Sequence, residues 1–205
     1  TELARQIQAE GLDVPVVLLA WDTRELFDFQ ARKDTSAIER TFLWQGDARM
    51  LVSIVKSVED WRNAEHDTGA VGVQVIILVE DNVRYYSSFL PVLYGELLRQ
   101  SQSLVPEGIN LSHKLMRLQA RPKILLCTTF EEAWEFFERH EENILGVIAD
   151  IEFPKDGRLE PEAGLTLARL VRSRQPDVPI MLQSSVHANQ AQAALVGAAF
   201  VLKES

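Results

Sequence analysis

The fold is decided by one strand and the acidic residue that ends it, Ile144-Leu145-Gly146-Val147-Ile148-Ala149-Asp150. The apolar residues before Asp150 are typical of a strand that is buried on both faces of a parallel sheet. Asp150 then stands at the carboxyl end of that strand, where open α/β sheets bind their ligands. A carboxylate in this place can accept a phosphoryl group. The stretch therefore predicts both a parallel sheet and a reactive carboxylate at its edge.

Strand-like and helix-like patterns alternate on both sides of this stretch, from Val73 onward. The predicted strands cover 75–79, 123–128, 144–149, 179–183 and 199–202, and the predicted helices cover 83–100, 131–140, 165–174 and 189–196. Such alternation predicts an α/β fold with a doubly wound parallel sheet and right-handed crossovers. We expect five strands in the flavodoxin-like order 2-1-3-4-5.

Polar residues follow several of these predicted strands. The pair Glu80-Asp81 follows the first, Ser184 follows the fourth, and Lys203 follows the fifth. Clustered carboxylates repel one another unless a cation joins them, and Mg²⁺ prefers a few carboxylates with backbone oxygen, water and phosphate. An Asp alone at a strand end is often only solvated, but its combination with these partners indicates phosphoryl chemistry.

Residues 73–205 resemble a response-regulator receiver domain of the CheY-like family. The matching features are Glu80-Asp81, Asp150 with Pro154, Gly164-Leu165, Pro179, Ser184, Gly197-Ala198, Phe200 and Lys203. Each match alone is weak, whereas all of them in this order are specific. The resemblance implies a two-component signalling domain that takes a phosphoryl group from a histidine kinase or a phosphotransfer protein and regulates an attached or partner output module.

The resemblance also assigns roles to individual residues. Asp150 would accept the phosphoryl group, and Mg²⁺ would be held by Asp81, Asp150 and the carbonyl of Glu152, with Glu80 acting through water. Lys203 would neutralise charge on the transferring oxygens. Ser184 would hydrogen-bond the acyl phosphate, although the adjacent Ser185 offers the same group. Phe200 would repack inward as part of a switch; as a residue of a strand it is equally a core aromatic.

Two other functions are compatible with the same residues. One is a phosphorylation-independent pseudo-receiver that acts as a protein-interaction or dimerisation module, through a long insertion and an acidic surface. The other is a Mg²⁺-dependent phosphatase with Asp150 as nucleophile, which is the poorer hypothesis because Glu152 stands where a second Asp is expected.

Three features depart from the receiver pattern. An inserted segment at 101–121 carries Leu111, Leu115 and Leu118 at helical spacing and predicts an added helix. The loop 154–164 is long, borders the proposed site and could gate it. The chain stops at Ser205, so we expect the closing helix of the domain to be missing.

An internal repeat precedes this region. Leu3-Ala4-Arg5 recurs as Leu167-Ala168-Arg169, and Asp13-Val14-Pro15 recurs at the same offset as Asp177-Val178-Pro179. A repeat this long predicts tandem copies of one fold. We expect residues 1–66 to be a partial, degenerate receiver-like segment, 67–72 a linker and 73–205 the receiver. The offset of the repeat places Ala20 at the Ser184 position, and aligning Phe42 with Phe200 places Gln45 at the Lys203 position. Both phosphoryl-binding groups are then absent, which predicts a structural or dimerising role, including homodimers by domain swapping.

The stretches 20–29, 42–47 and 84–86 are also similar to large bacterial signalling proteins. In those proteins, tandem receiver-like domains precede a phosphoenolpyruvate/pyruvate-binding module of the pyruvate phosphate dikinase type. Nothing in residues 1–205 carries that kinase chemistry, so we expect this chain to be regulatory and not an enzyme. A start at Thr1 without Met predicts a piece of a longer protein.

Composition narrows the partners and the compartment. With 205 residues, 46% hydrophobic and 25% charged, the chain suits one or two globular domains. A net charge of −9 argues against binding to nucleic acid or anionic membranes. The lone Cys127 favours a reducing, cytoplasmic location and a buried thiol. The scattered His66, His113, His140 and His187 predict surface or loop positions without a metal role.

Overall fold

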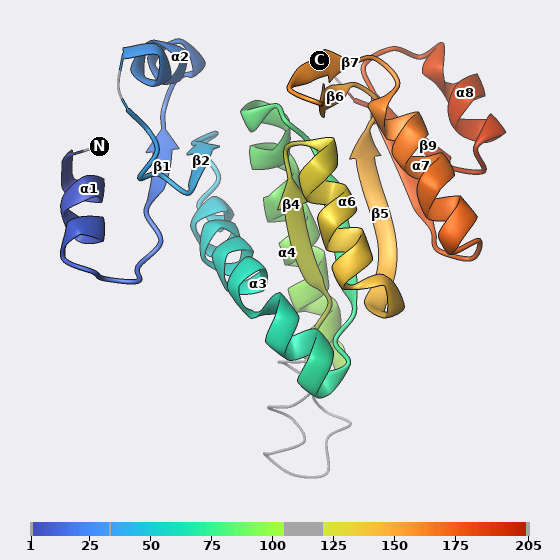
Figure 1. Ribbon diagram of the computed structural model, residues 1–205, viewed down its shortest axis with the longest axis horizontal. Coiled ribbons are helices and arrows are strands. Elements are labelled where there is room, and N and C mark those ends of the chain that lie inside the picture. The colour runs from blue at the N-terminus through green and yellow to red at the C-terminus, as the bar shows by residue number, and fades with distance from the viewer. Residues whose placement is uncertain (1, 33, 105–120, 204–205) are drawn as a thin grey trace. The chain divides into compact units, whose positions relative to one another are not determined.

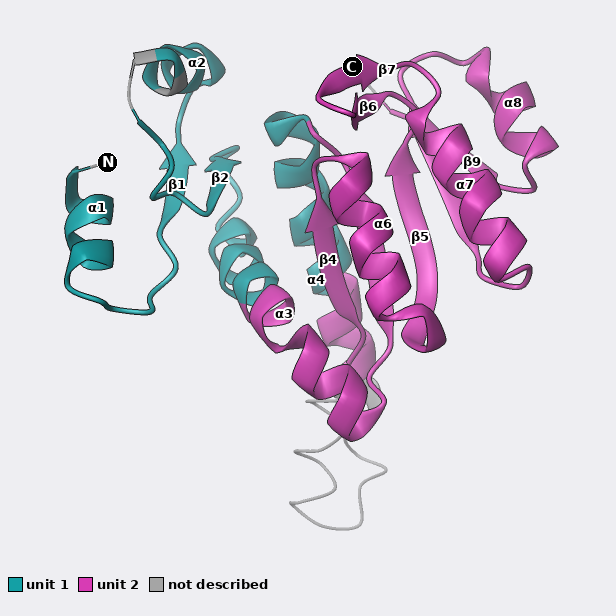
Figure 2. Ribbon diagram, in the orientation of Figure 1, with its two compact units in different colours: residues 1–58, 82–95 teal, residues 59–81, 96–205 magenta. Residues whose placement is uncertain are grey.

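The computed structural model describes residues 2–32, 34–104 and 121–203 (Figure 1). The chain forms two compact units (Figure 2). Unit 1 comprises Thr1–Val58 and Asn82–Gly95, and unit 2 comprises Glu59–Asp81 and Glu96–Ser205. Two continuous helices, α3 (Arg49–Val71) and α4 (Val83–Leu104), contribute residues to both units.

Unit 2 is built on a parallel sheet of five strands. Its members are β3 (Val75–Val79), β4 (Lys123–Cys127), β5 (Ile144–Asp150), β8 (Ile180–Ser184) and β9 (Ala199–Leu202). They lie in the order β4-β3-β5-β8-β9, which is 2-1-3-4-5 along the chain, and every neighbouring pair is parallel. The predicted α/β class and the five-stranded parallel sheet are therefore confirmed.

Strands β3 and β4 are largely apolar because both of their faces are covered. Val75, Ile77 and Val79 of β3 are buried, and every residue of β4 is buried. This is the burial expected for strands of a parallel sheet with helices on its faces. Cys127 at the end of β4 is a fully buried thiol, as the sequence predicted.

Helices α6 (Phe130–Arg139), α7 (Ala163–Arg174) and α8 (Asn189–Leu195) belong to unit 2. The hydroxyl of Thr129 caps α6 by accepting the N–H of Glu132 at 3.2 Å. Phe130, Ala133 and Phe137 form the buried stripe of α6. Through it, α6 packs on β3 and β4, while α7 contacts α6 and β8 (Figure 1).

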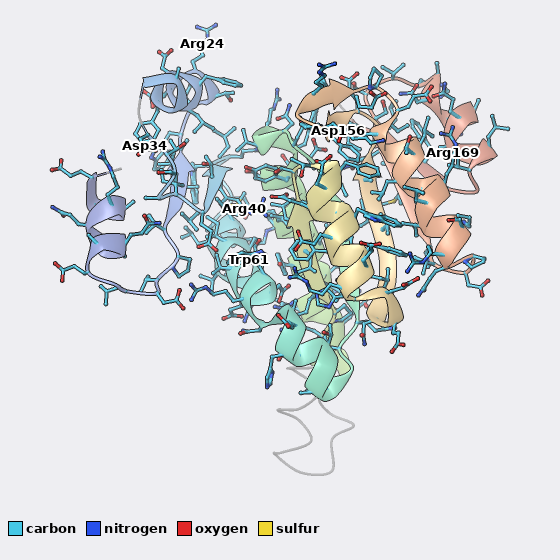
Figure 3. The ribbon with its side chains drawn as sticks, viewed as in Figure 1. Arg24, Asp34, Arg40, Trp61, Asp156 and Arg169 are labelled. Atoms are coloured by element: carbon cyan, nitrogen blue, oxygen red, sulfur yellow. The ribbon has the colours of Figure 1, made fainter. Side chains whose placement is uncertain are left out.

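The long predicted loop after Asp150 is a hairpin of β6 (Phe153–Lys155) and β7 (Arg158–Glu160). Its turn places Asp156 at φ 51° and Gly157 at φ 71°, and Figure 3 labels Asp156. The Asp156 N–H donates to the Glu131 carboxylate at 2.8 Å, and the Lys155 ammonium lies 4.7 Å from the centre of the Phe130 ring. The hairpin is thus fixed to the start of α6.

Residues 67–71 of the predicted linker are helical, because α3 continues to Val71. The buried residues of its last turns are Asp60, Ala64 and Thr68, spaced by one helical turn and small or polar. A helix face of this composition carries no apolar signal. The division into residues 1–66 and 73–205 stays a prediction, and the two compact units follow other bounds.

Asp60 of α3 covers the edge strand β4. Its carboxylate accepts the backbone N–H of Ile124 at 2.9 Å, and it also accepts two N–H groups of Arg121 at 2.6 and 3.0 Å. Asp60 is fully buried, and Arg121 is nearly so. A helix side chain therefore satisfies a backbone donor that an open sheet edge would leave to another chain.

His140 lies in the turn after α6, which agrees with the predicted surface or loop position, but its side chain is buried. It is 3% exposed, and its Nδ1 lies 3.2 Å from the Thr68 hydroxyl oxygen. Burial, with a smaller effect of Arg139, lowers the pKa of His140, while Glu65 opposes that shift. His66 and His187 are exposed as predicted, and His113 lies outside the described residues.

Unit 1 contains α1 (Glu2–Ala9), β1 (Val17–Ala20), α2 (Thr23–Arg32) and β2 (Arg40–Leu43), with the first turns of α3 and α4. Strands β1 and β2 are parallel, as are β8 and β9. The Trp44 N–H donates to the Ala20 carbonyl at 2.7 Å, as the Lys203 N–H donates to the Ser184 carbonyl at 2.9 Å. Within the proposed repeat, Trp44 and not Gln45 therefore corresponds to Lys203.

Helix α4 extends to Leu104, beyond its predicted end at residue 100, and Pro91 lies inside it. Most of the insertion 101–121, including its predicted leucine-rich helix, lies outside the described residues. Among the helices that are described, we find none with the length and apolar character needed to cross a membrane.

Candidate functional site

The carboxyl ends of four strands of unit 2 carry the candidate site. Glu80 and Asp81 follow β3, Asp150 ends β5, Ser184 ends β8 and Lys203 follows β9. The sheet ladder runs up to these residues, since the Glu80 N–H donates to the Cys127 carbonyl at 3.0 Å. Parallel pairing thus brings residues that are far apart in sequence to one edge of the sheet.

Lys203 joins two of the carboxylates. Its Nζ lies 2.5 Å from Oε2 of Glu80 and 2.5 Å from Oδ2 of Asp150. The side chains of Lys203 and Glu80 are 3% and 0% exposed, whereas that of Asp150 is 14% exposed. Asp150 is therefore the carboxylate of this pair that solvent can reach.

Glu80 is held by a second donor that the sequence did not suggest. Nε2 of Gln183 donates to Oε2 of Glu80 at 3.1 Å, and Gln183 is buried. Gln183 pairs with Asp150 in the register of β5 and β8. A buried carboxylate needs such partners, because burying an unpaired charge is costly. The only signal in the sequence that could have predicted Gln183 as a site residue is its position directly before Ser184.

Asp81 lies among like charges. Burial is the main cause that raises the pKa of Asp81, and Asp150 and Glu152 raise it further, while Lys203 opposes them. Carboxylate oxygens of Glu80, Asp81 and Asp150 all lie within 4.8 Å of one another. One ammonium group does not balance this much negative charge, and the oxygen donors suit a hard divalent cation.

The Ser184 hydroxyl is fixed by two donors. Its Oγ accepts the backbone N–H of Val186 at 3.1 Å and the side-chain Nδ2 of Asn189 at 3.0 Å. Ser184 is 6% exposed. The adjacent Ser185 is exposed, so the structure favours Ser184 as the ordered hydroxyl.

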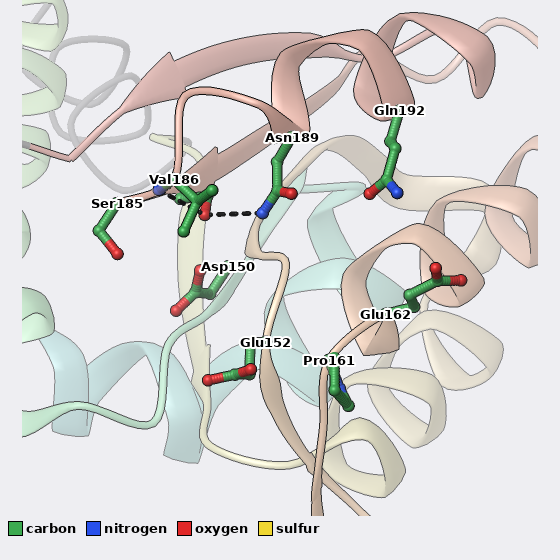
Figure 4. A pocket seen from close by; sticks show the side chains of 9 residues that line it. Asp150, Glu152, Pro161, Glu162, Ser185, Val186, Asn189 and Gln192 are labelled. Carbon is green, nitrogen blue, oxygen red and sulfur yellow. Dashed lines mark hydrogen bonds between the residues drawn. The ribbon is translucent and has the colours of Figure 1, made fainter.

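A cavity of about 330 Å³ opens beside these groups (Figure 4). Its lining combines carboxylates, hydroxyls and amides; the residues are Asp150, Glu152, Pro161, Glu162, Ser184, Ser185, Val186, Asn189 and Gln192. The cavity gives a ligand access to Asp150 and Ser184 together.

Gly164 at the start of α7 packs closely against the backbone of Asp150 and Ile151. Its N–H donates to the Ile151 carbonyl at 2.9 Å. A Cβ at this position would lie 2.1 Å from the Asp150 carbonyl oxygen and 2.9 Å from Cα of Ile151. Because backbone atoms cannot swing aside, only glycine allows α7 to approach the loop so closely.

The structure brings together five of the predicted site residues: Glu80, Asp81, Asp150, Ser184 and Lys203. Glu152 is exposed and lines the cavity with Asp150. Phe200 lies on β9, half-buried and packed against the core, so its position suits a core aromatic. Its switch role stays a prediction.

Comparison with known proteins found a likeness among solved structures. No family model matches the chain, and no curated protein matches it. Its structure is similar to that of the chemotaxis response regulator CheY4 of Vibrio cholerae, with 13% sequence identity and a TM-score of 0.38. The match covers 65% of this chain and 88% of that one. At this TM-score we base the proposed function on the side chains of the site and not on the likeness.

Proposed function

We propose that unit 2 is a phosphoacceptor receiver domain. Asp150 accepts a phosphoryl group in a Mg²⁺-dependent reaction, and the modified site changes conformation to regulate an output module. The observation that carries this proposal is the Lys203 ammonium, 2.5 Å from both Glu80 and Asp150, beside the third carboxylate, Asp81.

The residues present fit a magnesium ion. Asp81 and Asp150 offer carboxylate oxygens, and the Glu152 carbonyl is a further candidate ligand. Glu80 already accepts hydrogen bonds from Lys203 and Gln183, so it would act on a bound ion through water. When bound, Mg²⁺ supplies positive charge that offsets the charge of the phosphoryl oxygens.

The chain's own groups supply the remaining steps. A carboxylate oxygen of Asp150 attacks phosphorus, and a P–O bond forms while the bond to the donor breaks; the donor leaves with that electron pair. Lys203 exchanges its contact with the Asp150 carboxylate for one with a phosphoryl oxygen. The Ser184 hydroxyl, which lines the same cavity, donates a hydrogen bond to another phosphoryl oxygen.

The proposal implies partners for this chain. The phosphoryl donor is a histidine kinase or a phosphotransfer protein, and the output is an attached or separate module. The chain then serves as a regulatory domain in the cytoplasm of a bacterium. A pyruvate phosphate dikinase-like module elsewhere in the parent protein remains part of the same proposal.

Unit 1 takes no phosphoryl group in this proposal. As a partial second copy of the fold, it carries Ala20 and Trp44 where unit 2 carries Ser184 and Lys203. Ala20 has no hydroxyl to donate to a phosphoryl oxygen, and Trp44 has no positive charge to offset the charge of that oxygen. A structural or dimerising role, including domain swapping, suits such a segment.

A phosphorylation-independent interaction module is the second candidate. It is favoured by the apolar side chains of Leu195, Val201 and Leu202, which are 87%, 45% and 43% exposed on α8 and β9. Exposed apolar groups of this size favour a protein partner. Partner binding that survives Asp150→Ala unchanged favours this candidate.

Calorimetric titration with beryllofluoride, a mimic of the phosphoryl group, tests the proposed receiver site. In the presence of Mg²⁺ we expect one beryllofluoride per chain, and no binding after chelation of the metal. Asp81→Asn weakens binding in Mg²⁺ because one ligand charge is lost. Equal binding with and without Mg²⁺, or no binding at all, contradicts the proposal.

A further inference from the structure

We infer that Asn189 is a positioning residue of the phosphoryl site, which directs the proton of Ser184 toward the bound phosphoryl group. This inference rests on the proposed receiver function. Asn189 is a residue of α8 for which the sequence predicted no role.

A serine hydroxyl oxygen has two lone pairs and one proton. In Ser184 both acceptor positions are used, by the Val186 N–H at 3.1 Å and by Asn189 Nδ2 at 3.0 Å. Figure 4 draws these bonds as dashed lines. The proton must therefore occupy the remaining direction around Oγ. Within the described part of the chain, no acceptor takes this proton.

The two donors differ in kind. The Val186 N–H belongs to the backbone two residues after Ser184, a local turn that any serine at this position can form. Asn189 is a side chain that reaches Ser184 from the start of α8, and it is half-buried. Without Asn189, one lone pair is released and the hydroxyl gains other orientations.

The direction of the proton matters because of what the cavity contains. Ser184, Asn189 and Asp150 line the same cavity. A hydroxyl that has already been oriented as a donor loses less freedom when a phosphoryl oxygen arrives, and this preorganisation strengthens binding of the modified state. Asn189 thus acts on the phosphoryl group through Ser184, without touching the acceptor carboxylate.

Substitutions at Asn189 separate this role from simple packing. Asn189→Ala removes the donor and should weaken beryllofluoride binding in Mg²⁺ about three- to tenfold, as for the loss of one hydrogen bond between neutral groups. Asn189→Asp keeps the shape but presents only acceptors, so Ser184 turns its proton toward the new carboxylate. The affinity should then fall further than in Asn189→Ala, although Asp is the closer match in shape.

The Ser184→Ala background removes the hydroxyl that Asn189 orients. There, Asn189→Ala and Asn189→Asp should leave the remaining beryllofluoride affinity unchanged, which excludes repulsion by the new charge as the cause. Gln190→Ala is the matched control, since Gln190 is the exposed neighbour on α8 and lies outside the cavity. Urea unfolding of each variant establishes that it is folded.

The outcomes distinguish the two levels of the proposal. Wild-type binding with the order wild type, Asn189→Ala, Asn189→Asp, and with that order lost in Ser184→Ala, supports the role of Asn189. Wild-type binding that is insensitive to both substitutions, or equally sensitive without Ser184, overturns it. Absence of wild-type binding overturns the receiver function itself, and the inference falls with it.

Discussion

At the scale of single residues, Lys203 gives the site its asymmetry. One ammonium group contacts Glu80, which is fully buried, and Asp150, which borders a cavity. The buried carboxylate needs the lysine to remain charged, whereas in the proposed reaction Asp150 exchanges the lysine for a phosphoryl oxygen. Under this proposal, a single side chain serves both the stability of the fold and the chemistry of the site.

Lys203→Met tests the structural half of this role. Removing the cation leaves Glu80 buried and unpaired, which should lower the free energy of unfolding by about 3 kcal/mol. Urea unfolding at neutral pH measures the loss. The double variant Glu80→Gln/Lys203→Met removes both charges and should recover most of it. An equal loss in the single and the double variant argues against the pairing.

Gly164→Ala tests the close approach of α7 to the loop after Asp150. A Cβ 2.1 Å from the Asp150 carbonyl oxygen forces backbone atoms apart, so we expect a loss of about 2 kcal/mol or more and weaker phosphoryl uptake. Gly69→Ala is the control, because Gly69 is an exposed glycine within α3 and a Cβ there meets no atom within 4 Å. The control should gain up to about 1 kcal/mol.

The sequence predicted the acidic and basic residues of the site because they follow apolar strands, and parallel strands end at one edge. It did not predict Gln183 and Asn189, since polar amides are common in sequences and only the folded chain shows what they bind. It did not predict the burial of the His140 side chain either, because its hydrogen-bond partner Thr68 lies on a helix that the sequence did not predict there.

At the scale of elements, α3 shows where hydrophobic periodicity fails. The face that it buries in unit 2 consists of Asp60, Ala64 and Thr68, and two exposed or terminal glycines, Gly69 and Gly72, lie close by. A helix can bury a charged residue only if hydrogen-bond partners offset its charge. For Asp60 these partners are Arg121 and the Ile124 N–H. Those partners are distant in sequence, so the stretch was predicted to be a linker.

Asp60→Ala should destabilise unit 2 strongly. It leaves the Arg121 guanidinium without its buried carboxylate and the Ile124 N–H without an acceptor, at a cost of about 3 kcal/mol or more. Asp67→Ala provides the comparison, since Asp67 pairs with Lys123 at 2.6 Å but is partly exposed. We expect a loss of about 1 kcal/mol there. Equal midpoints of urea unfolding for the two variants would contradict the role of Asp60 at the edge strand β4.

His140 should make stability depend on pH. Burial lowers the pKa of His140 below the ordinary 6.5. Below this pH, His140 therefore binds a proton more readily in the unfolded chain than in the folded chain. The free energy of unfolding then falls as pH drops below about 6.5. Urea midpoints at about pH 7.5 and about pH 5.5 measure this change. His140→Gln should show a smaller fall over the same interval; an identical fall would mean that His140 is not responsible.

At the scale of the whole molecule, the sequence predicted the five-stranded sheet correctly but misplaced one residue of the repeat. The alternation of strands and helices predicted the five-stranded sheet, because covered parallel strands read as short apolar runs. The alignment of the two copies of the repeat placed the Lys203 equivalent one residue too far along, at Gln45. Sequence alignment matched two phenylalanines, whereas the ladder bonds of Trp44 and Lys203 set the register. Register depends on pairing between strands, which a single strand does not encode.

The measurement that tests the central claim most directly is the intact mass of the protein after incubation with acetyl phosphate and Mg²⁺. We expect the wild type to gain one phosphoryl group, because Asp150 has the required partners and unit 1 lacks them. Asp150→Asn should gain none. No gain in the wild type, or an equal gain in Asp150→Asn, would contradict the assignment of Asp150 as the phosphoryl acceptor.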